Sequence, residues 1–233
     1  MTAIRLTPVL LVLLAVSAAA APAVDPHLWL EDVEGAKAIG WVKERNAASL
    51  GELQGDPRYE PLRQEMRAIL NAADRIPAPA WRGGFVHNFW QDAEHVRGLW
   101  RRATLAEYRK KDPAWEVLLD IDKLGRDEGE SWVYKGADCR APRYARCLVS
   151  LSRGGKDAVV VREFDVERAT FAAAGFVLPE AKHRFAWLND DALLVGSDFG
   201  PGSLTKSGYP RTIRRWARGT PLSSAPVDRK SVV

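Results

Sequence analysis

The 233-residue chain is poor in the residues that build metal sites, with two cysteines and four histidines. The histidines are scattered, and none pairs with a cysteine at ligand spacing: they are His27, His87, His95 and His183. Structural zinc sites need four ligands at short, regular spacings. The sequence therefore indicates no metal site, and we expect no cofactor.

The chain also lacks an excess of one charge, since 34 basic and 30 acidic residues leave a formal net charge of +4. Its densest basic stretch is interrupted by Ile213 and Trp216, as in a half-buried strand, and contains Arg211, Arg214, Arg215 and Arg218. A nucleic-acid surface requires a concentrated basic patch. We therefore expect no nucleic-acid partner.

Long hydrophobic runs are absent apart from one near the N-terminus, at residues 6–16. This run follows Arg5, is too short to span a bilayer as a mature helix, and leads into an alanine-rich stretch at 18–23. The pattern predicts a secretory signal peptide at residues 1–23, cleaved after Ala20, Ala21 or Ala23. The mature chain would then be periplasmic or secreted, without a membrane segment; an uncleaved signal anchor is the alternative.

Export changes the interpretation of the two cysteines, because an oxidising compartment permits disulfide bonds. Cys139 and Cys147 enclose a short loop with Pro142 in it, and they are candidates for a disulfide. Two free thiols remain the alternative.

The residues that are abundant indicate a globular protein: 46% are hydrophobic and nine are tryptophans, which we expect to serve mainly as core. Apolar residues at three- and four-residue steps predict one amphipathic helix over about 38–53. A second helix is predicted to begin at Asp56-Pro57, a capping residue followed by proline, and to stop near Asp74.

From Trp81 onward the apolar period shortens to about two residues, which predicts short strands without helices between them. Arg153-Gly154-Gly155 supplies the clearest hairpin turn. A sandwich, an open barrel and propeller blades all fit this pattern, and a recurrence of about 50 residues modestly favours blades. The predicted strands are 85–90, 99–104, 115–120, 132–135, 147–152, 158–164, 185–188, 193–197 and 212–217.

Several segments together resemble the prolyl oligopeptidase family of serine peptidases. Residues 25–32 read DPHLWLED and resemble the segment that opens these proteins; FWQD at 89–92, GLWRR at 98–102 and WEVLLD at 115–120 resemble the first blade of the family's propeller. The resemblance extends from Asp25 to about Leu222. It implies a mainly β fold, a partial β-propeller formed by the opening blades of a seven-bladed ring, preceded by an N-terminal helical segment.

The resemblance also implies a division of labour within a longer protein. Residues 24–78 would pack on a C-terminal α/β-hydrolase domain that this chain lacks, and 79–227 would form two to three blades that gate the access of short, proline-containing peptides. The last residues, 228–233, do not continue the family's pattern, and we expect them to be a non-native tail. Lys182 and His183 precede an inner strand and are the candidates for substrate contact.

The family's nucleophilic serine has no counterpart in this sequence. No G-x-S-x-G motif occurs, and the glycine-flanked serines, Ser197 and Ser203, lack the flanking pattern of a nucleophile turn. Peptide hydrolysis needs an activated nucleophile, a base and oxyanion donors. We therefore expect the chain to be inactive alone, as the non-catalytic part of an exported peptidase; a stand-alone exported β-rich binding or interaction module is the alternative.

Overall fold

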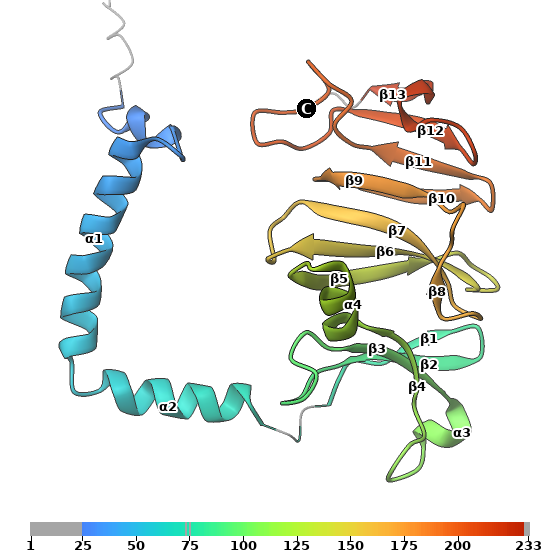
Figure 1. Cartoon of the computed structure of the whole chain (residues 1–233), viewed down its shortest axis with the longest axis horizontal. Coiled ribbons are helices and arrows are strands. Elements are labelled where there is room, and N and C mark those ends of the chain that lie inside the picture. The colour runs from blue at the N-terminus through green and yellow to red at the C-terminus, as the bar shows by residue number, and fades with distance from the viewer. Residues whose placement is uncertain (1–24, 73, 75, 231–233) are drawn as a thin grey trace, which may run out of the picture. The chain divides into compact units, whose positions relative to one another are not determined.

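The computed structural model describes residues 25–72, 74 and 76–230 (Figure 1). The chain divides between Arg67 and Ala68 into two compact units, one helical and one built from strands. The predicted signal peptide lies outside the described residues. Within them, no helix is both long and apolar enough to cross a membrane.

Two helices dominate the N-terminal unit: α1 (Ala36–Gly55) and α2 (Tyr59–Leu70), preceded by the short 3-10 helix η1 (Leu28–Glu31). The Trp29 ring packs edge-on against Trp41 with centroids 6.1 Å apart. Between the helices, the Asp56 carboxylate accepts a hydrogen bond from the Arg58 backbone N–H at 2.9 Å. Both helices were predicted, although α2 starts two residues later and ends four residues earlier than its pattern indicates.

Much of the apolar surface of these helices stays exposed. The exposed side chains include Leu50, Leu53, Leu62, Met66, Ile69 and Leu70. Ala38 is the buried residue of α1, and α2 has none. The helices therefore carry exposed apolar side chains along much of their length.

The second unit contains three antiparallel sheets, each made from consecutive strands. Sheet 1 comprises β1 (Ala80–Arg82), β2 (Phe85–Trp90), β3 (Leu99–Thr104) and β4 (Glu116–Asp120). Sheet 2 comprises β5 (Trp132–Cys139), β6 (Arg146–Arg153), β7 (Val159–Asp165), β8 (Thr170–Phe171) and β9 (Val177–Ala181). Sheet 3 comprises β10 (Arg184–Asn189), β11 (Ala192–Gly196), β12 (Thr212–Ala217) and β13 (Val227–Lys230). Such successive meanders are typical of propeller blades, and the three sheets do not close on themselves.

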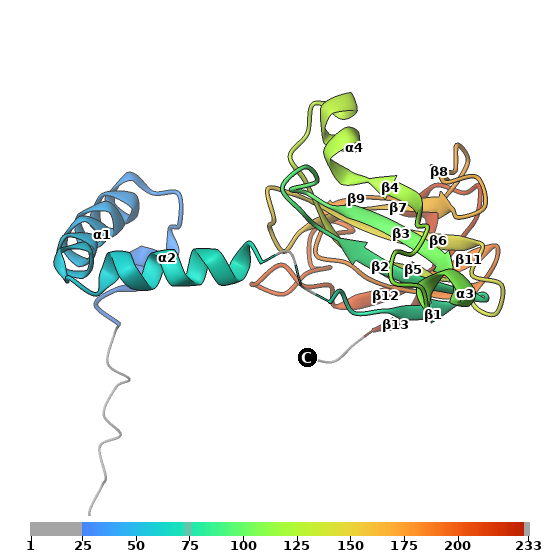
Figure 2. The same cartoon turned by 90° about the horizontal axis from the view of Figure 1, so that it is seen from below.

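All nine predicted strands are present, but the expectation that no helices lie between them is wrong. Two short α-helices, α3 (Leu105–Tyr108) and α4 (Ile121–Glu128), lie between strands, and the 3-10 helix η2 covers Leu222–Ser224. Figure 2 shows α3 and α4 at opposite ends of the strands. Strand β13 includes residues 228–230 of the predicted tail and pairs with β12. The predicted domain boundaries, including this tail, stay predictions.

Two apolar cores hold the sheets together as successive layers (Figure 1). The first lies between sheets 1 and 2 and contains Trp100, Leu119, Trp132, Val149, Leu151 and Phe164. The second lies between sheets 2 and 3 and contains Leu148, Val161, Phe176, Leu193, Val195 and Trp216. Strand β6 contributes to both because successive strand residues face opposite sides of a sheet. Sheet 2 is thus buried on both faces.

Antiparallel order sends alternate connections to opposite ends of the sheets. One end, called here the 140–145 end, carries the turns at 83–84, 140–145, 166–169 and 190–191. The other, the 182–183 end, carries the connections at 91–98, 154–158, 182–183 and 197–211. Two candidate regions therefore lie a strand length apart.

Candidate functional site

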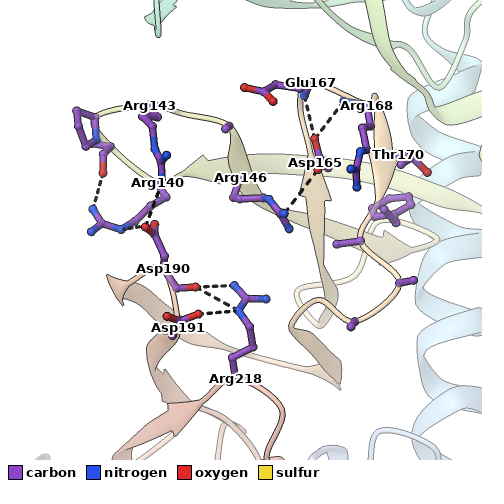
Figure 3. A pocket seen from close by; sticks show the side chains of 17 residues that line it. Arg140, Arg143, Arg146, Asp165, Glu167, Arg168, Thr170, Asp190, Asp191 and Arg218 are labelled. Carbon is purple, nitrogen blue, oxygen red and sulfur yellow. Dashed lines mark hydrogen bonds and ion pairs between the residues drawn. The ribbon is translucent and has the colours of Figure 1, made fainter.

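A pocket of about 940 Å³ opens at the 140–145 end, where sheet 2 meets sheet 3 (Figure 3). The β5–β6 hairpin lines one side, and the segment that follows β7 lines another. The remaining lining comes from the β10–β11 turn and from Arg218, directly after β12. Five arginines and four acidic residues take part: Arg140, Arg143, Arg146, Arg168 and Arg218, with Asp165, Glu167, Asp190 and Asp191.

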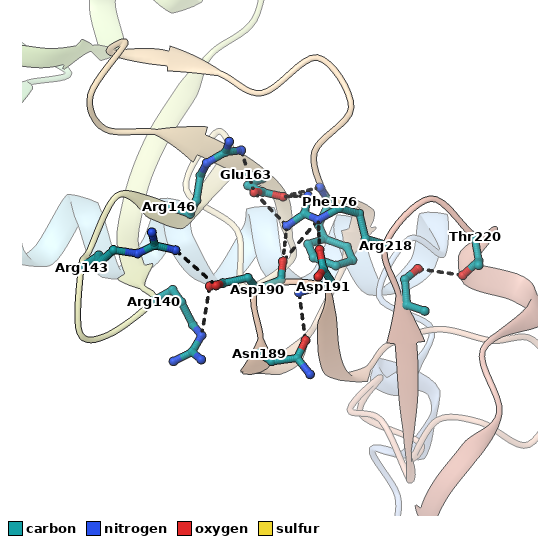
Figure 4. A network of polar contacts seen from close by, with 11 residues as sticks. Arg140, Arg143, Arg146, Glu163, Phe176, Asn189, Asp190, Asp191, Arg218 and Thr220 are labelled. Carbon is teal, nitrogen blue, oxygen red and sulfur yellow. Dashed lines mark hydrogen bonds and ion pairs between the residues drawn. The ribbon is translucent and has the colours of Figure 1, made fainter.

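A buried carboxylate beneath the pocket holds two of these arginines. The Glu163 side chain is completely buried, and it accepts two hydrogen bonds from Arg218, at 2.7 and 3.1 Å, and one from Arg146 at 3.2 Å (Figure 4). It also accepts the Phe176 backbone N–H at 2.9 Å. Since Glu163 lies on β7 and Arg218 follows β12, this pair ties sheet 2 to sheet 3.

The environment of Arg218 keeps it charged. Burial acts to lower its pKa, but the hydrogen bond and charge of Glu163, with Asp191, together outweigh burial, so the pKa lies above its ordinary value. Its guanidinium also lies 4.4 Å from the centroid of the Phe176 ring. Arg218 is therefore a fixed cation in the pocket wall rather than a proton donor.

A second ion-pair group joins the turns of sheets 2 and 3. The Asp190 carboxylate lies 3.5 Å from Arg140 Nε and 3.4 Å from Arg143 Nη2, and its backbone carbonyl accepts a 2.6 Å hydrogen bond from Arg218. Asn189 shapes this turn by accepting the Asp191 N–H at 2.9 Å. Figure 4 shows the two groups converging on Arg218.

The chemistry available in the pocket is recognition rather than catalysis. No serine, cysteine or histidine is among its lining residues, and Thr170 is its one hydroxyl-bearing residue. A nucleophile and base within hydrogen-bond reach, which acyl transfer needs, are therefore absent from this pocket. Fixed guanidinium groups instead suit the binding of carboxylate or other oxyanion groups.

The structure places Lys182 and His183 at the other end of the sheets. Lys182 Nζ donates to the Ser207 carbonyl at 2.9 Å and lies 4.6 Å from the Tyr209 ring centroid. His183 Nε2 donates to the Pro179 carbonyl at 2.5 Å, and burial lowers its pKa although hydrogen bonds to backbone carbonyls act the other way. Both side chains fasten the β9–β10 connection, and their contact with substrate stays a prediction.

The two cysteines are joined in a disulfide. Cys139 and Cys147 stand directly opposite each other in the register of β5 and β6, and their sulfur atoms are bonded. The bond closes the base of the hairpin whose tip lines the pocket. Among the described residues, no group of three or more His, Cys, Asp or Glu side chains is arranged to hold a metal ion.

The pocket residues could not be predicted from the sequence, because their partners are far apart along the chain. Glu163 and Arg218 are separated by 55 positions, and Arg143 and Asp190 by 47. One signal was present: Val159, Val161 and Glu163 alternate along a predicted strand, which puts a carboxylate on an apolar face. A charge in such a position requires a partner when it is buried.

Comparisons with known proteins agree with this architecture. The model of the prolyl oligopeptidase N-terminal β-propeller domain matches residues 17–227. An uncharacterized peptidase of Sinorhizobium fredii is 43% identical over 202 residues, which is 86% of this chain and 28% of that protein. An uncharacterized peptidase of Rickettsia prowazekii is 34% identical over 205 residues, covering 84% of this chain and 28% of the relative.

Solved structures show the same likeness. A post-proline cleaving enzyme from Rickettsia typhi superposes with a TM-score of 0.75 at 33% identity, covering 88% of this chain and 30% of that enzyme. Oligopeptidase B from Leishmania major shares the fold, with a TM-score of 0.63 at 13% identity. The chain thus spans less than a third of these relatives' length. The chain belongs to the prolyl oligopeptidase family and carries its N-terminal β-propeller-type domain together with the helical segment that precedes it.

Proposed function

We propose that this chain is the non-catalytic N-terminal part of an exported prolyl oligopeptidase-like serine peptidase that cleaves short peptides. One observation carries the proposal: 88% of the chain superposes on a post-proline cleaving enzyme but accounts for only 30% of it. The sequence contains no G-x-S-x-G motif, and the pocket at the 140–145 end is not lined by a nucleophile with a base. Catalysis therefore belongs to a C-terminal α/β-hydrolase domain outside this chain.

In this proposal the sheets restrict which peptides reach the catalytic domain. Sheets that pack on both neighbours form a ring around a narrow centre, and a ring admits short, flexible chains more readily than folded ones. The apolar stripes of α1 and α2 support a covering partner, since large exposed apolar surfaces mark interaction sites. The hydrolase domain is the partner we assign to them.

The gene beyond codon 227 provides the first test. We expect an in-frame extension, to the length of the relatives, that contains a GGSNGG-type serine motif. A natural stop codon at the present end, or an extension without such a serine, would remove the peptidase assignment. The stand-alone binding module would then be the better interpretation.

A chimera provides the second test. Joining this chain to the remaining part of the Rickettsia typhi enzyme should give cleavage of a short proline-containing peptide and little cleavage of a folded protein. Lys182→Ala in the chimera should raise KM without lowering kcat if Lys182 contacts substrate. A matched chimera with the hydrolase serine replaced controls for contaminating peptidases.

Export is a separate part of the proposal. The Cys139–Cys147 disulfide supports it, because such bonds persist in oxidising compartments. Cell fractionation with N-terminal sequencing should find the protein outside the cytoplasm, starting after Ala20, Ala21 or Ala23. Cytosolic protein that retains Met1 would contradict export while leaving the peptidase assignment intact.

A further inference from the structure

A second cavity, of about 260 Å³, lies between sheets 1 and 2 at the 140–145 end. Strands β1, β2 and β3 contribute Arg82, His87 and Arg102, and His87 stands directly opposite Arg102 in the register. The β5–β6 hairpin contributes Arg143, and the turn after β7 contributes Glu167. The cavity is separate from the proposed catalytic role and has no assigned ligand.

Three arginines and one carboxylate, Glu167, contribute charges to the wall of this cavity. Arg102 is neutralised by Glu116, with two hydrogen bonds of 2.7 and 2.9 Å. Arg82, by contrast, is half-buried and contacts the Cys139 sulfur at 3.4 Å, which is a weak acceptor. No carboxylate of the described residues forms an ion pair with Arg82. Arg82 is therefore a guanidinium without an ion-pair partner, although Glu167 lines the same cavity.

His87 is the second unusual feature of this wall. It is 3% exposed, and its Nδ1 atom is buried without a hydrogen-bond partner among the described residues. A buried polar atom without a hydrogen-bond partner destabilises the folded chain and needs an explanation. Burial first, and then the charges of Arg82 and Arg102, lower the pKa of His87 to about 4, while Glu116 acts the other way. The neutral imidazole retains one N–H that can donate.

We propose that this cavity binds a small oxyanion, a carboxylate or a phosphate, against Arg82 and Arg102 with His87 as a neutral donor. The planar guanidinium fork matches the geometry of carboxylate and phosphate oxygens. The bound anion gives Arg82 the ion-pair partner that it lacks. It also joins sheet 1 to the β5–β6 hairpin, because Arg143 and Tyr144 line the same cavity.

Equilibrium dialysis of the full chain with labelled phosphate or acetate, at constant ionic strength in chloride, tests this site. We expect saturable binding that is about tenfold weaker in Arg82→Gln, since one charge-assisted hydrogen-bond donor is lost. Arg184→Gln is the matched control: Arg184 is exposed, lies on β10 next to the 182–183 end, and forms no ion pair with a described residue. Its variant should bind like the unchanged chain.

The choice of anion identifies the source of the ligand. Saturation by phosphate but not acetate indicates a phosphate group, and saturation by a free-acid dipeptide but not its amide indicates a peptide carboxylate; either result supports the site. Uptake that never saturates, or equal uptake by Arg82→Gln and Arg184→Gln, overturns it. Self-association of the chain does not prevent this test. Dialysis measures bound anion in any oligomeric state, and the cavity lies between two sheets rather than on an outer face.

A measurement on the unchanged chain covers the case in which Arg82→Gln fails to fold. Phenylglyoxal modifies accessible arginines, and mass spectrometry then locates the modified residues. We expect phosphate to protect Arg82 and to leave the modification of Arg184 unchanged. Equal modification of Arg82 with and without phosphate overturns the proposal.

Discussion

Glu163 is the residue whose charge most directly holds two sheets together. Its completely buried carboxylate pairs with Arg146 and Arg218, which are 44% and 27% exposed at the side chain. Glu163→Gln keeps the size but removes the carboxylate that the two arginines share, leaving Arg146 with Asp165 at 3.7 Å and Arg218 with Asp191 at 3.4 Å. We expect the free energy of unfolding to fall by about 2–3 kcal/mol, below the range for fully buried pairs because both arginines remain partly solvated.

Thermal unfolding at matched low concentration measures this effect. The control is Glu94→Gln, because Glu94 is exposed and its side chain forms no ion pair with a described residue. That variant should change stability by less than about 0.5 kcal/mol. Equal midpoints for the two variants would show that Glu163 does not couple the sheets.

His87 should make stability depend on pH at mildly acidic values. Its folded-state pKa, lowered to about 4, lies below the unfolded value near 6.5. The unfolded chain therefore binds the proton first, and stability present above about pH 6.5 is lost as the pH falls towards 4. Between pH 7 and pH 4.5, we expect the free energy of unfolding of His87→Asn to fall by about 2 kcal/mol less than that of the unchanged chain, with both measured in chloride without phosphate. Parallel pH profiles would contradict this.

At the residue scale, the sequence predicted the disulfide pair but not the pocket. Cys139 and Cys147 are close in sequence, so their pairing is a local property. Asp190 and Arg218 gain their partners only when sheets 2 and 3 stack, and no spacing rule along the chain encodes that contact. The alternation of Val161 and Glu163 was the nearest local signal.

At the element scale, a helix or strand could be predicted where its local sequence pattern is strong. Strands with clear alternation and a glycine turn, such as β6 and β7, were found, and Gly154 and Gly155 adopt the positive φ angles that the turn requires. Strand β9 was missed because Pro179 lies within it, and proline argues against a strand. Helix α4 has eight residues, too few to establish a helical period.

Helix α4 nevertheless has strong end signals, which make it testable. Asp120 accepts a hydrogen bond from the Lys123 backbone N–H at 2.8 Å, and Gly129 ends the helix with φ of 66°. Asp120→Ala should lower the free energy of unfolding by about 1 kcal/mol, because the first turn loses its cap. Asp120→Asn retains an accepting oxygen, so its free energy of unfolding should fall by less than that of Asp120→Ala. Equal losses in thermal unfolding would exclude a capping role.

The β5–β6 hairpin should depend on its disulfide. The cysteines are eight positions apart, and a loop of this length contributes about 2.5 kcal/mol in the chain-entropy estimate. We expect dithiothreitol to lower the thermal midpoint of the unchanged chain but not that of the Cys139→Ser/Cys147→Ser variant. If dithiothreitol leaves the thermal midpoint of both proteins unchanged, the disulfide adds nothing to stability.

At the scale of the whole molecule, the family resemblance carried more information than periodicity. Alternating strands alone left a sandwich, a barrel and a propeller open, whereas the match over residues 17–227 and the three stacked meanders agree with a propeller. The order in which the sheets stack is a non-local property. It depends on which sheets are apolar on both of their faces. Sheet 2 satisfies this condition, because its residues belong to both cores.

The outer faces of the sheet stack should determine how the isolated chain behaves. A blade packs on two neighbours, so three stacked sheets leave two outer faces without a neighbouring sheet among the described residues. Exposed apolar side chains include Trp81, Val117, Leu188 and Val227 in the sheets, besides those of α1 and α2. We expect the purified chain to bind a hydrophobic dye and to self-associate with rising concentration. Dye fluorescence and sedimentation velocity measure both properties.

A variant locates the surface responsible. Leu62→Glu/Ile69→Glu places two charges on the exposed stripe of α2, and it should reduce dye binding if that stripe contributes to it. Glu65→Gln, an exposed change on the same helix, should leave dye binding as it is. A monomer that melts sharply and reversibly without binding dye would mean that the outer sheets are stable uncovered, and the need for further blades would lose its physical basis.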